Sequence, residues 1–319
     1  MKLADVSTEL TILILIIACT AVFTYLEPNF LTYNTFVVLA VLSAELGFIA
    51  LGISFLIATG EIDLSSAAVI TMTLWLYDGW ATGLGFNLFL GMLVPLVAGI
   101  AIGFIQGFIC LKMRIPAFIV TFVGMIIWQG LVTATTGGYN EGYLGPTKGW
   151  LTFALDGYVG GVPLEFVWFI VLGAVFTVVL TRTRFGSHVL AVGGSETVAR
   201  NLGVRVERTK ILCFILSAVM ASVATIFFFN RQFYVSSTVM VQAPLFAICA
   251  SVVGGCRAGR ANLVGTTLAT ILIIIIQTGM VMVGVPSTLY MAAVGVVLVI
   301  FATIHLKSKG LSWRMVWRR

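Results

Sequence analysis

Apolar runs long enough to cross a membrane follow one another along almost the whole chain. A helix needs about 20 apolar residues to cross the hydrocarbon core of a bilayer. Ten stretches come close to this length: residues 10–26, 36–59, 63–80, 86–111, 115–135, 164–181, 211–230, 239–255, 261–284 and 287–306. The stretches 63–80 and 239–255 are the weakest, because each is short and begins or ends in glycine-rich or polar sequence. We therefore predict an all-α polytopic membrane protein with about ten transmembrane helices.

Charged residues are too scarce for a protein that is surrounded by water. Of the 319 residues, 60% are hydrophobic and only 9% are charged, whereas soluble proteins carry about 25% charged residues. A soluble domain of this length needs more polar surface to cover its core. The composition therefore excludes a soluble enzyme, a disulfide-stapled secreted domain and a disordered tail.

The basic residues in the gaps between apolar runs set the orientation of the chain. With the N-terminus in the cytoplasm, only Lys148 and Arg231 fall in outward-facing gaps. The inward-facing segments contain the rest: Lys2, Lys112, Arg114, Arg182, Arg184, Arg200, Arg205, Arg208, Lys210, Arg257, Arg260, Lys307, Lys309, Arg314, Arg318 and Arg319. This is the positive-inside pattern, and it predicts that both termini are cytoplasmic. Because the same topology explains the net charge of +6, we expect membrane lipid, and no nucleic acid, as a partner of these charges.

The sequence contains no motif for catalysis, redox chemistry or metal binding. Its five cysteines form no CxxC pair, and its two histidines, His188 and His305, are far apart. The motifs GxxxxGK(S/T), HExxH and GxSxG are missing. We predict no enzyme activity, no metal site and no cofactor in this chain. Uphill transport would then take its energy from an ion gradient or from another subunit.

The inward-facing segment 182–210 contains the signals of a short amphipathic helix. Ser195 is a suitable N-cap, Glu196 follows where the helix dipole favours an acid, and Gly203 suits the position after the helix. Between them Val198, Ala199 and Leu202 share one helical face. A helix this short is unstable alone in water, so it packs either on its own membrane domain or on a cytoplasmic subunit.

Acidic and glycine-rich positions mark a candidate polar pathway. Glu45 lies near the middle of the stretch 36–59, where a buried acid is costly and often functional. Two glycine-containing breaks, residues 60–66 (GEIDLSS) and 254–260 (GGCRAGR), occupy corresponding places in the two halves of the chain. Such interrupted segments point to the substrate path of a transporter, although both breaks could also be plain cytoplasmic turns. Further polar side chains within apolar runs either bind a neighbouring helix or line a channel: Gln106, Gln129, Asn230, Gln232, Gln242 and Gln277.

Several segments, in a fixed order along nearly the whole chain, carry a family likeness. They are residues 50–65 (ALGISFLIATGEIDLS), 112–125 (KMRIPAFIVTFVGM), 183–204 (TRFGSHVLAVGGSETVARNLGV) and 252–255 (VVGG), followed by GT at 265–266 and the final span. The first resembles a segment that ends in Gly-Gly-Ile-Asp-Leu-Ser, and the third resembles a principal cytoplasmic loop, in permeases of bacterial ABC importers for ribose-type sugars. The chain departs from this family at Glu61, where a second glycine is usual, at residues 66–68, and at Arg257 and Arg260, where small residues are common.

The resemblance implies a single permease domain, residues 1–319, with a type II-like ABC importer fold in the bacterial inner membrane. Such a subunit pairs with an identical or paralogous permease, with ATPase subunits that bind ATP and Mg, and with a periplasmic substrate-binding protein. The segment 182–210 becomes the cytoplasmic coupling loop, with coupling residues Glu196, Val198, Ala199, Arg200, Leu202 and Gly203. The outward loop 136–163, rich in glycine and aromatic residues, is either a solvated connection or the contact for the binding protein.

The expected substrate is a small polar solute, with a monosaccharide as the first choice. For its pathway we select the polar and glycine positions of the breaks and spans: Glu45, Gly60, Glu61, Asp63, Ser65, Gln129, Gly254 and Gly255. Within the same family a nucleoside, inositol or sugar-like signalling molecule is the alternative. Different classes are an ion-gradient-driven carrier, with Glu45 or Asp63 as its coupling site, and a membrane scaffold or receptor that transports nothing.

Overall fold

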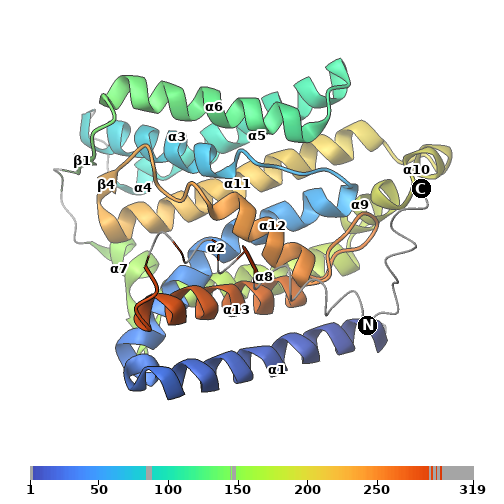
Figure 1. Ribbon diagram of the computed structural model, residues 1–319. Helices are drawn as coiled ribbons and strands as arrows, with labels where there is room; N and C mark the ends of the chain where they lie inside the picture. Colours follow the sequence, from blue (N-terminus) through green and yellow to red (C-terminus); the bar gives the residue numbers. More distant parts are fainter. Residues whose placement is uncertain are drawn as a thin grey trace.

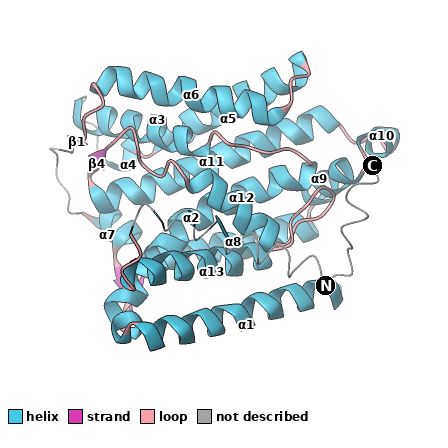
Figure 2. Cartoon of the chain, viewed as in Figure 1, coloured by secondary structure: helices cyan, strands magenta, loops and turns pink. Residues whose placement is uncertain are grey.

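The structure, a computed structural model, is built almost entirely of helices (Figures 1 and 2). It describes residues 3–83, 88–143, 145, 149–286, 289, 292 and 295–296. Its long helices are α1 (Leu3–Leu26), α2 (Tyr33–Thr59), α5 (Leu93–Met113), α6 (Ala117–Thr136), α8 (Leu164–Arg182), α11 (Val206–Gln232) and α13 (Leu263–Met282). Shorter helical elements are η1 (Pro28–Leu31), α3 (Ser66–Asp78), η2 (Gly79–Gly83), α4 (Leu88–Gly91), α7 (Trp150–Asp156), α9 (Arg184–Gly194), α10 (Glu196–Asn201) and α12 (Ala243–Val253).

Seven segments are long and apolar enough to cross a membrane, among the residues that the structure describes: 8–26, 33–59, 88–113, 117–136, 164–182, 206–232 and 263–282. They coincide with seven of the ten stretches expected from the sequence. The expected last span, 287–306, lies almost wholly outside the described residues. The total of ten helices therefore stays a prediction, while the multi-pass all-α architecture is confirmed.

The two weakest stretches, 63–80 and 239–255, are only partly helical. α3 has 13 residues and α12 has 11, and at 1.5 Å per residue α12 covers about half of a bilayer core about 30 Å thick. Non-helical backbone completes each segment, at residues 60–65 before α3 and at 236–242 before α12. Such discontinuous helices are tolerated in a membrane where the protein itself surrounds the freed backbone groups.

The helix α2 forms the centre of the bundle. It packs against α8, α11, α12 and α13, and most of its residues are buried, whereas α1 is mostly exposed and packs along α13 (Figure 1). Phe48 of α2 stacks on Phe227 of α11, with ring centroids 4.8 Å apart. Small residues let the helices approach closely: a Cβ atom at Gly52 would lie 2.8 Å from Cβ of Met220. Movement of α2 would therefore displace several neighbours.

Several short elements lie at the two ends of the bundle. The first residues of α1 lie at the same end as α9 and α10, and α7, β1 (Glu141–Gly142) and β4 (Tyr234–Val235) lie at the opposite end (Figure 1). There β1 pairs with β4, and β2 (Tyr158–Val159) pairs with β3 (Val162–Pro163). The described part of the outward loop 136–163 is thus largely structured, which its composition does not reveal.

Candidate functional site

The first glycine break begins with a tight helix end. Gly60 adopts a left-handed conformation with φ of +90°, which costs glycine far less than other residues. Its N–H donates to the carbonyl oxygen of Ile57 at 3.0 Å, and the N–H of Glu61 donates to that of Leu56 at 3.1 Å. These two bonds form the Schellman arrangement. They fix the direction in which the side chain of Glu61 leaves α2.

Asp63 and Ser65 lie in a buried hydrogen-bond network. Only 1% of Asp63 is exposed, and its Oδ1 accepts bonds from the backbone N–H and the hydroxyl of Ser65, at 2.7 and 2.6 Å. Its Oδ2 accepts from the hydroxyl of Ser217 on α11 at 2.7 Å. The Ser65 hydroxyl also lies 3.0 Å from Oε1 of Gln106 on α5. Asp63 thus ties the break to α11 and Ser65 ties it to α5. The contact of Asp63 with substrate stays a prediction.

The second glycine break lies against the first. The N–H of Gly259 donates to the carbonyl oxygen of Ala58, near the end of α2, at 2.9 Å. Gly255 has φ of +100°. Gly254 contacts the first turn of α13 so closely that a Cβ atom there would lie 2.6 Å from Cα of Thr266. The three glycines selected for the pathway are thus required by the backbone: Gly60 and Gly255 by their positive φ, and Gly254 by its close contact with α13. Their exposure to substrate stays a prediction.

The short helix predicted after Ser195 is present as α10. The Ser195 hydroxyl accepts a bond from the N–H of Val198 at 3.4 Å, and Gly203 follows the helix with φ of +81°. The predicted apolar face is divided: Ala199 is 1% exposed, whereas Val198 is 55% and Leu202 75% exposed. The helix therefore packs on its own domain through Ala199 and presents the two larger side chains outward. The remaining coupling candidate, Arg200, forms an exposed ion pair with Glu207 at 2.6 Å.

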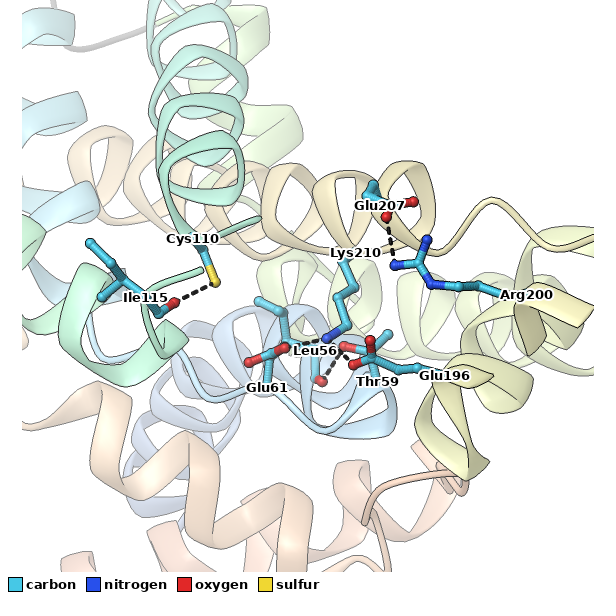
Figure 3. A network of polar contacts seen from close by, with 9 residues as sticks. All are labelled: Leu56, Thr59, Glu61, Cys110, Ile115, Glu196, Arg200, Glu207 and Lys210. Atoms are coloured by element: carbon cyan, nitrogen blue, oxygen red, sulfur yellow. Dashed lines mark hydrogen bonds and ion pairs between the residues drawn. The ribbon is translucent and has the colours of Figure 1, made fainter. Parts of the chain in front are cut away.

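Figure 3 shows that Lys210 of α11 joins the first break to α10. Its Nζ lies 2.5 Å from Oε1 of Glu61 and 2.5 Å from Oε1 of Glu196. Lys210 is only 5% exposed; its pair with Glu61 is largely shielded from water, whereas the Glu196 side chain is 48% exposed. We call Lys210, Glu61 and Glu196 the Lys210 cluster. Sequence reasoning counted Lys210 only as one of many inward-facing charges.

Glu45, which the sequence marks as a costly acid within an apolar run, has a cationic partner. It forms an ion pair with Arg231 in the last turn of α11, and Oε2 of Glu165, at the start of α8, lies 3.9 Å from Nε of Arg231. Arg231, which the loop count placed in an outward gap, is therefore part of a helix and half-buried. Burial also raises the pKa of Asp156, at the end of α7, while the charge of Arg231 acts to lower it. Among the described residues, the guanidinium of Arg231 thus lies among several acids at the end of the bundle opposite α10.

Glu45 also lines a small pocket next to the discontinuous segment, and most of the other lining residues are apolar: Leu42, Leu46, Met240, Ala243, Phe246 and Ile274. The pocket has a volume of about 130 Å³. Its polar side chains are Glu45 of α2, Gln242 just before α12, and Gln277 of α13. Gln129 of α6 lies outside this lining and donates its amide N–H to the carbonyl oxygen of Ser237 at 3.0 Å. Gln129 therefore holds the non-helical backbone before α12. For Gln242 and Gln277, the sequence left open whether they bind a neighbouring helix or line a channel, and the structure places both in the pocket lining.

The residues that the structure describes contain no group of three or more His, Cys, Asp and Glu side chains that could hold a metal ion. Burial raises the pKa of Cys256, in the second break, while hydrogen bonds from Thr266 and the backbone of Asn262 act to lower it. The Cys256 sulfur is 3.4 Å from the Thr266 hydroxyl oxygen. This cysteine is a buried packing residue in the described geometry.

Comparisons with known proteins agree with this architecture. A family model described as branched-chain amino acid transport system / permease component matches residues 35–302. The chain is 29% identical to the ribose import permease of Escherichia coli (strain K12), over 93% of both chains. It is 32% identical to the L-arabinose transport system permease of the same strain, over 76% of this chain and 71% of that one. It is 28% identical to the xylose/arabinose import permease of Sulfolobus acidocaldarius, over 92% and 84%.

A solved structure has the same fold. It is an inward-facing conformation of a metal-chelate type ABC transporter, with a TM-score of 0.50 and 15% sequence identity. The superposition covers 99% of this chain and 100% of that chain. At this identity the likeness describes the arrangement of helices alone.

Proposed function

Because the chain belongs to the family of branched-chain amino acid transport system permease components, we propose that it carries a monosaccharide through an ABC importer. It is a multi-pass inner-membrane protein and a transport subunit. The relatives named for ribose, for arabinose and for xylose support a monosaccharide as the cargo. A nucleoside, inositol or sugar-like signalling molecule is the alternative within this function.

The pocket beside α12, with three polar side chains on an otherwise apolar lining, is the observation that carries the proposal. A sugar offers hydroxyl groups that both donate and accept hydrogen bonds, and the amides of Gln242 and Gln277 do the same. The carboxylate of Glu45 is paired with Arg231, so it adds an acceptor without an uncompensated charge. A neutral polyol suits such a lining better than an ion, which would have to replace the bound guanidinium.

The exposed apolar side chains of α10, and the need for an external energy source, indicate the partners of this subunit. The exposed Val198 and Leu202 form the contact with an ATPase subunit, and ATP and Mg bind to that subunit and not to this chain. The described elements of the outer loop 136–163 face the periplasmic substrate-binding protein. A second permease, identical or paralogous, completes the path.

The mechanism is alternating access driven from outside the chain. ATP binding draws the two ATPase subunits together, and the α10 helices move with them. Such a nucleotide state shifts the permease only because it binds the outward-facing and inward-facing conformations with different affinity. The sugar crosses between these conformations past the discontinuous segments, where helix ends and unwound backbone face a path.

A mild-detergent pull-down of the tagged chain from its native membrane tests this function. We expect a subunit with a nucleotide-binding P-loop to be recovered with it, together with ATPase activity. Reconstitution with the binding protein should then give ATP-dependent uptake of labelled pentoses. Recovery of the chain alone, with uptake driven by a proton or sodium gradient, would overturn the proposal in favour of a secondary carrier.

A further inference from the structure

The Lys210 cluster joins three segments that are separate in the sequence. Glu61 follows Gly60 at the end of α2, Glu196 begins α10, and Lys210 lies in the second turn of α11 (Figure 3). The Glu196 side chain is 48% exposed, whereas the side chains of Lys210 and Glu61, which form the shielded pair, are only 6% and 18% exposed. A charge pair shielded from water in this way is screened little by salt and costs much to separate. The three segments are therefore held to one another through a single ammonium group.

The helix α2 connects this cluster to the pocket that Glu45 lines. It is continuous from Tyr33 to Thr59, and Glu45, which lines the pocket, lies on it. At 1.5 Å per residue, the part of the helix from Glu45 to its end at Thr59 is about 21 Å long. A helix moves as a rigid element, so a displacement at Glu61 also displaces Glu45.

We propose that Lys210 is a positioning residue that transmits the movement of α10 to the inner end of α2, and through α2 to the pocket. This inference rests on the proposed function and names the route inside the permease by which the ATPase acts. When α10 moves with the ATPase, Glu196 pulls on Lys210, and Lys210 pulls on Glu61. The glutamate in place of the family's usual glycine supplies the last link in this chain.

Other bonds around the cluster hold the fold without making this link. The exposed pair Arg200–Glu207 joins α10 to α11 but does not reach the break. Asp63 binds Ser217, and Gly259 binds Ala58, so the break keeps its position on the domain when Glu61 is changed. Loss of the Glu61 charge should therefore affect coupling more than folding.

The test compares three variants in the reconstituted complex of permease, ATPase and binding protein. Glu61→Gln keeps the shape of the side chain and removes its charge, whereas Glu61→Asp keeps the charge. Glu207→Gln is the matched control, because it breaks an ion pair between the same two helices outside the cluster. The measured quantity is the number of sugar molecules taken up for each ATP hydrolysed, with complex assembly checked by co-purification.

We expect Glu61→Gln to assemble and hydrolyse ATP while its uptake per ATP falls about fivefold or more, the lower range of measured coupling effects. Glu61→Asp should retain most of the ratio, and Glu207→Gln all of it. Lys210→Met should behave as Glu61→Gln does; if this variant does not fold, the Glu61 variants decide. An unchanged ratio in Glu61→Gln, or an equal loss in Glu207→Gln, overturns the inference and leaves the proposed function intact. Failure of the unaltered chain to bind any ATPase overturns both.

Discussion

Lys210 and Arg231 lie at opposite ends of α11, and each forms an ion pair with a glutamate of the segment that contains α2. Lys210 pairs with Glu61 just beyond the inner end of α2, and Arg231 pairs with Glu45 within it. The two helices therefore run antiparallel, with a charge contact near each end of their interface. Buried pairs of this kind add little net stability but penalise a change of register strongly, because a slip would leave buried charges without partners. The pairs fix how α2 and α11 lie against each other.

Replacing Arg231 should destabilise the protein more than replacing an exposed arginine. Arg231→Gln leaves Glu45 and Glu165 buried next to each other without their cation. We expect a loss of about 3–5 kcal/mol, the range for breaking a buried pair on one side. Thermal unfolding in detergent measures this, with the exposed Arg208→Gln as the control. Equal melting temperatures for the two variants would contradict the role of Arg231.

The Glu45→Gln variant separates an importer from an ion-driven carrier. Its carboxylate is held by Arg231 and takes no part in the energy supply that we propose. Uptake by the reconstituted complex should therefore remain dependent on ATP and insensitive to a proton uncoupler. Glu141→Gln, at the exposed strand β1, is the control. Gradient-driven uptake by the unaltered chain that Glu45→Gln abolishes would make Glu45 a coupling site and the chain a carrier.

Leu202→Asp should disrupt docking of the ATPase and leave the permease folded. Leu202 is 75% exposed, and a surface substitution usually changes stability by about 0.5 kcal/mol or less. At a protein interface, however, the aspartate would bury a charge in an apolar contact. We expect the ATPase to be lost from the pull-down while the melting temperature is unchanged. Leu202→Met should keep the ATPase, and co-purification with Leu202→Asp at the normal level would rule out α10 as the docking helix.

Two glycine-to-alanine variants should change the stability of the protein in opposite directions. In Gly265→Ala the new methyl group would collide with the backbone of Gly254 in the second break, and overpacking of this kind typically costs about 1–3 kcal/mol. Gly130 of α6 has open space around it, so Gly130→Ala should stabilise its helix by about 0.5–1 kcal/mol. Melting temperatures of the purified variants test both. A stable Gly265→Ala would mean that α12 and α13 can separate at this point.

Cys256 should resist alkylation until the protein is unfolded. It is 2% exposed, and burial raises its pKa, so little of the reactive thiolate is present at neutral pH. A cysteine introduced as Leu202→Cys should react quickly under the same conditions, because that position is exposed. Peptide mapping after maleimide treatment distinguishes the two sites. Rapid labelling of Cys256 in the folded protein would show that the second break opens.

Local features of the fold could be predicted from the sequence because they depend on neighbours in the chain. Apolar length predicts the long helices, and Ser195 and Gly203 mark the ends of α10 through caps that they form with adjacent residues. The sequence of α9 also indicates a helix, because the apolar residues Phe185, Val189 and Val192 recur at helical spacing. The seven-residue α7 is too short for its periodicity to be recognised.

The charge contacts of the candidate site could not be predicted in this way. Lys210 and Glu61 are 149 positions apart, and Arg231 and Glu45 are 186 apart. Only the packing of α2 on α11 selects these partners among the many charges of the inward and outward gaps. The division of the α10 face has the same origin, since α9 and the start of α11 cover Ala199 and leave Leu202 uncovered.

The exposed Val198 and Leu202 also constrain how a cell makes this protein. An apolar pair that projects from the membrane domain into water is an aggregation hazard and a handle for chaperones and proteases until a partner covers it. If the permease is made in excess of the ATPase that we propose as its partner, Val198 and Leu202 stay exposed to water. We therefore expect unassembled permease to be degraded faster than permease whose Val198 and Leu202 are covered by the ATPase that we propose as its partner.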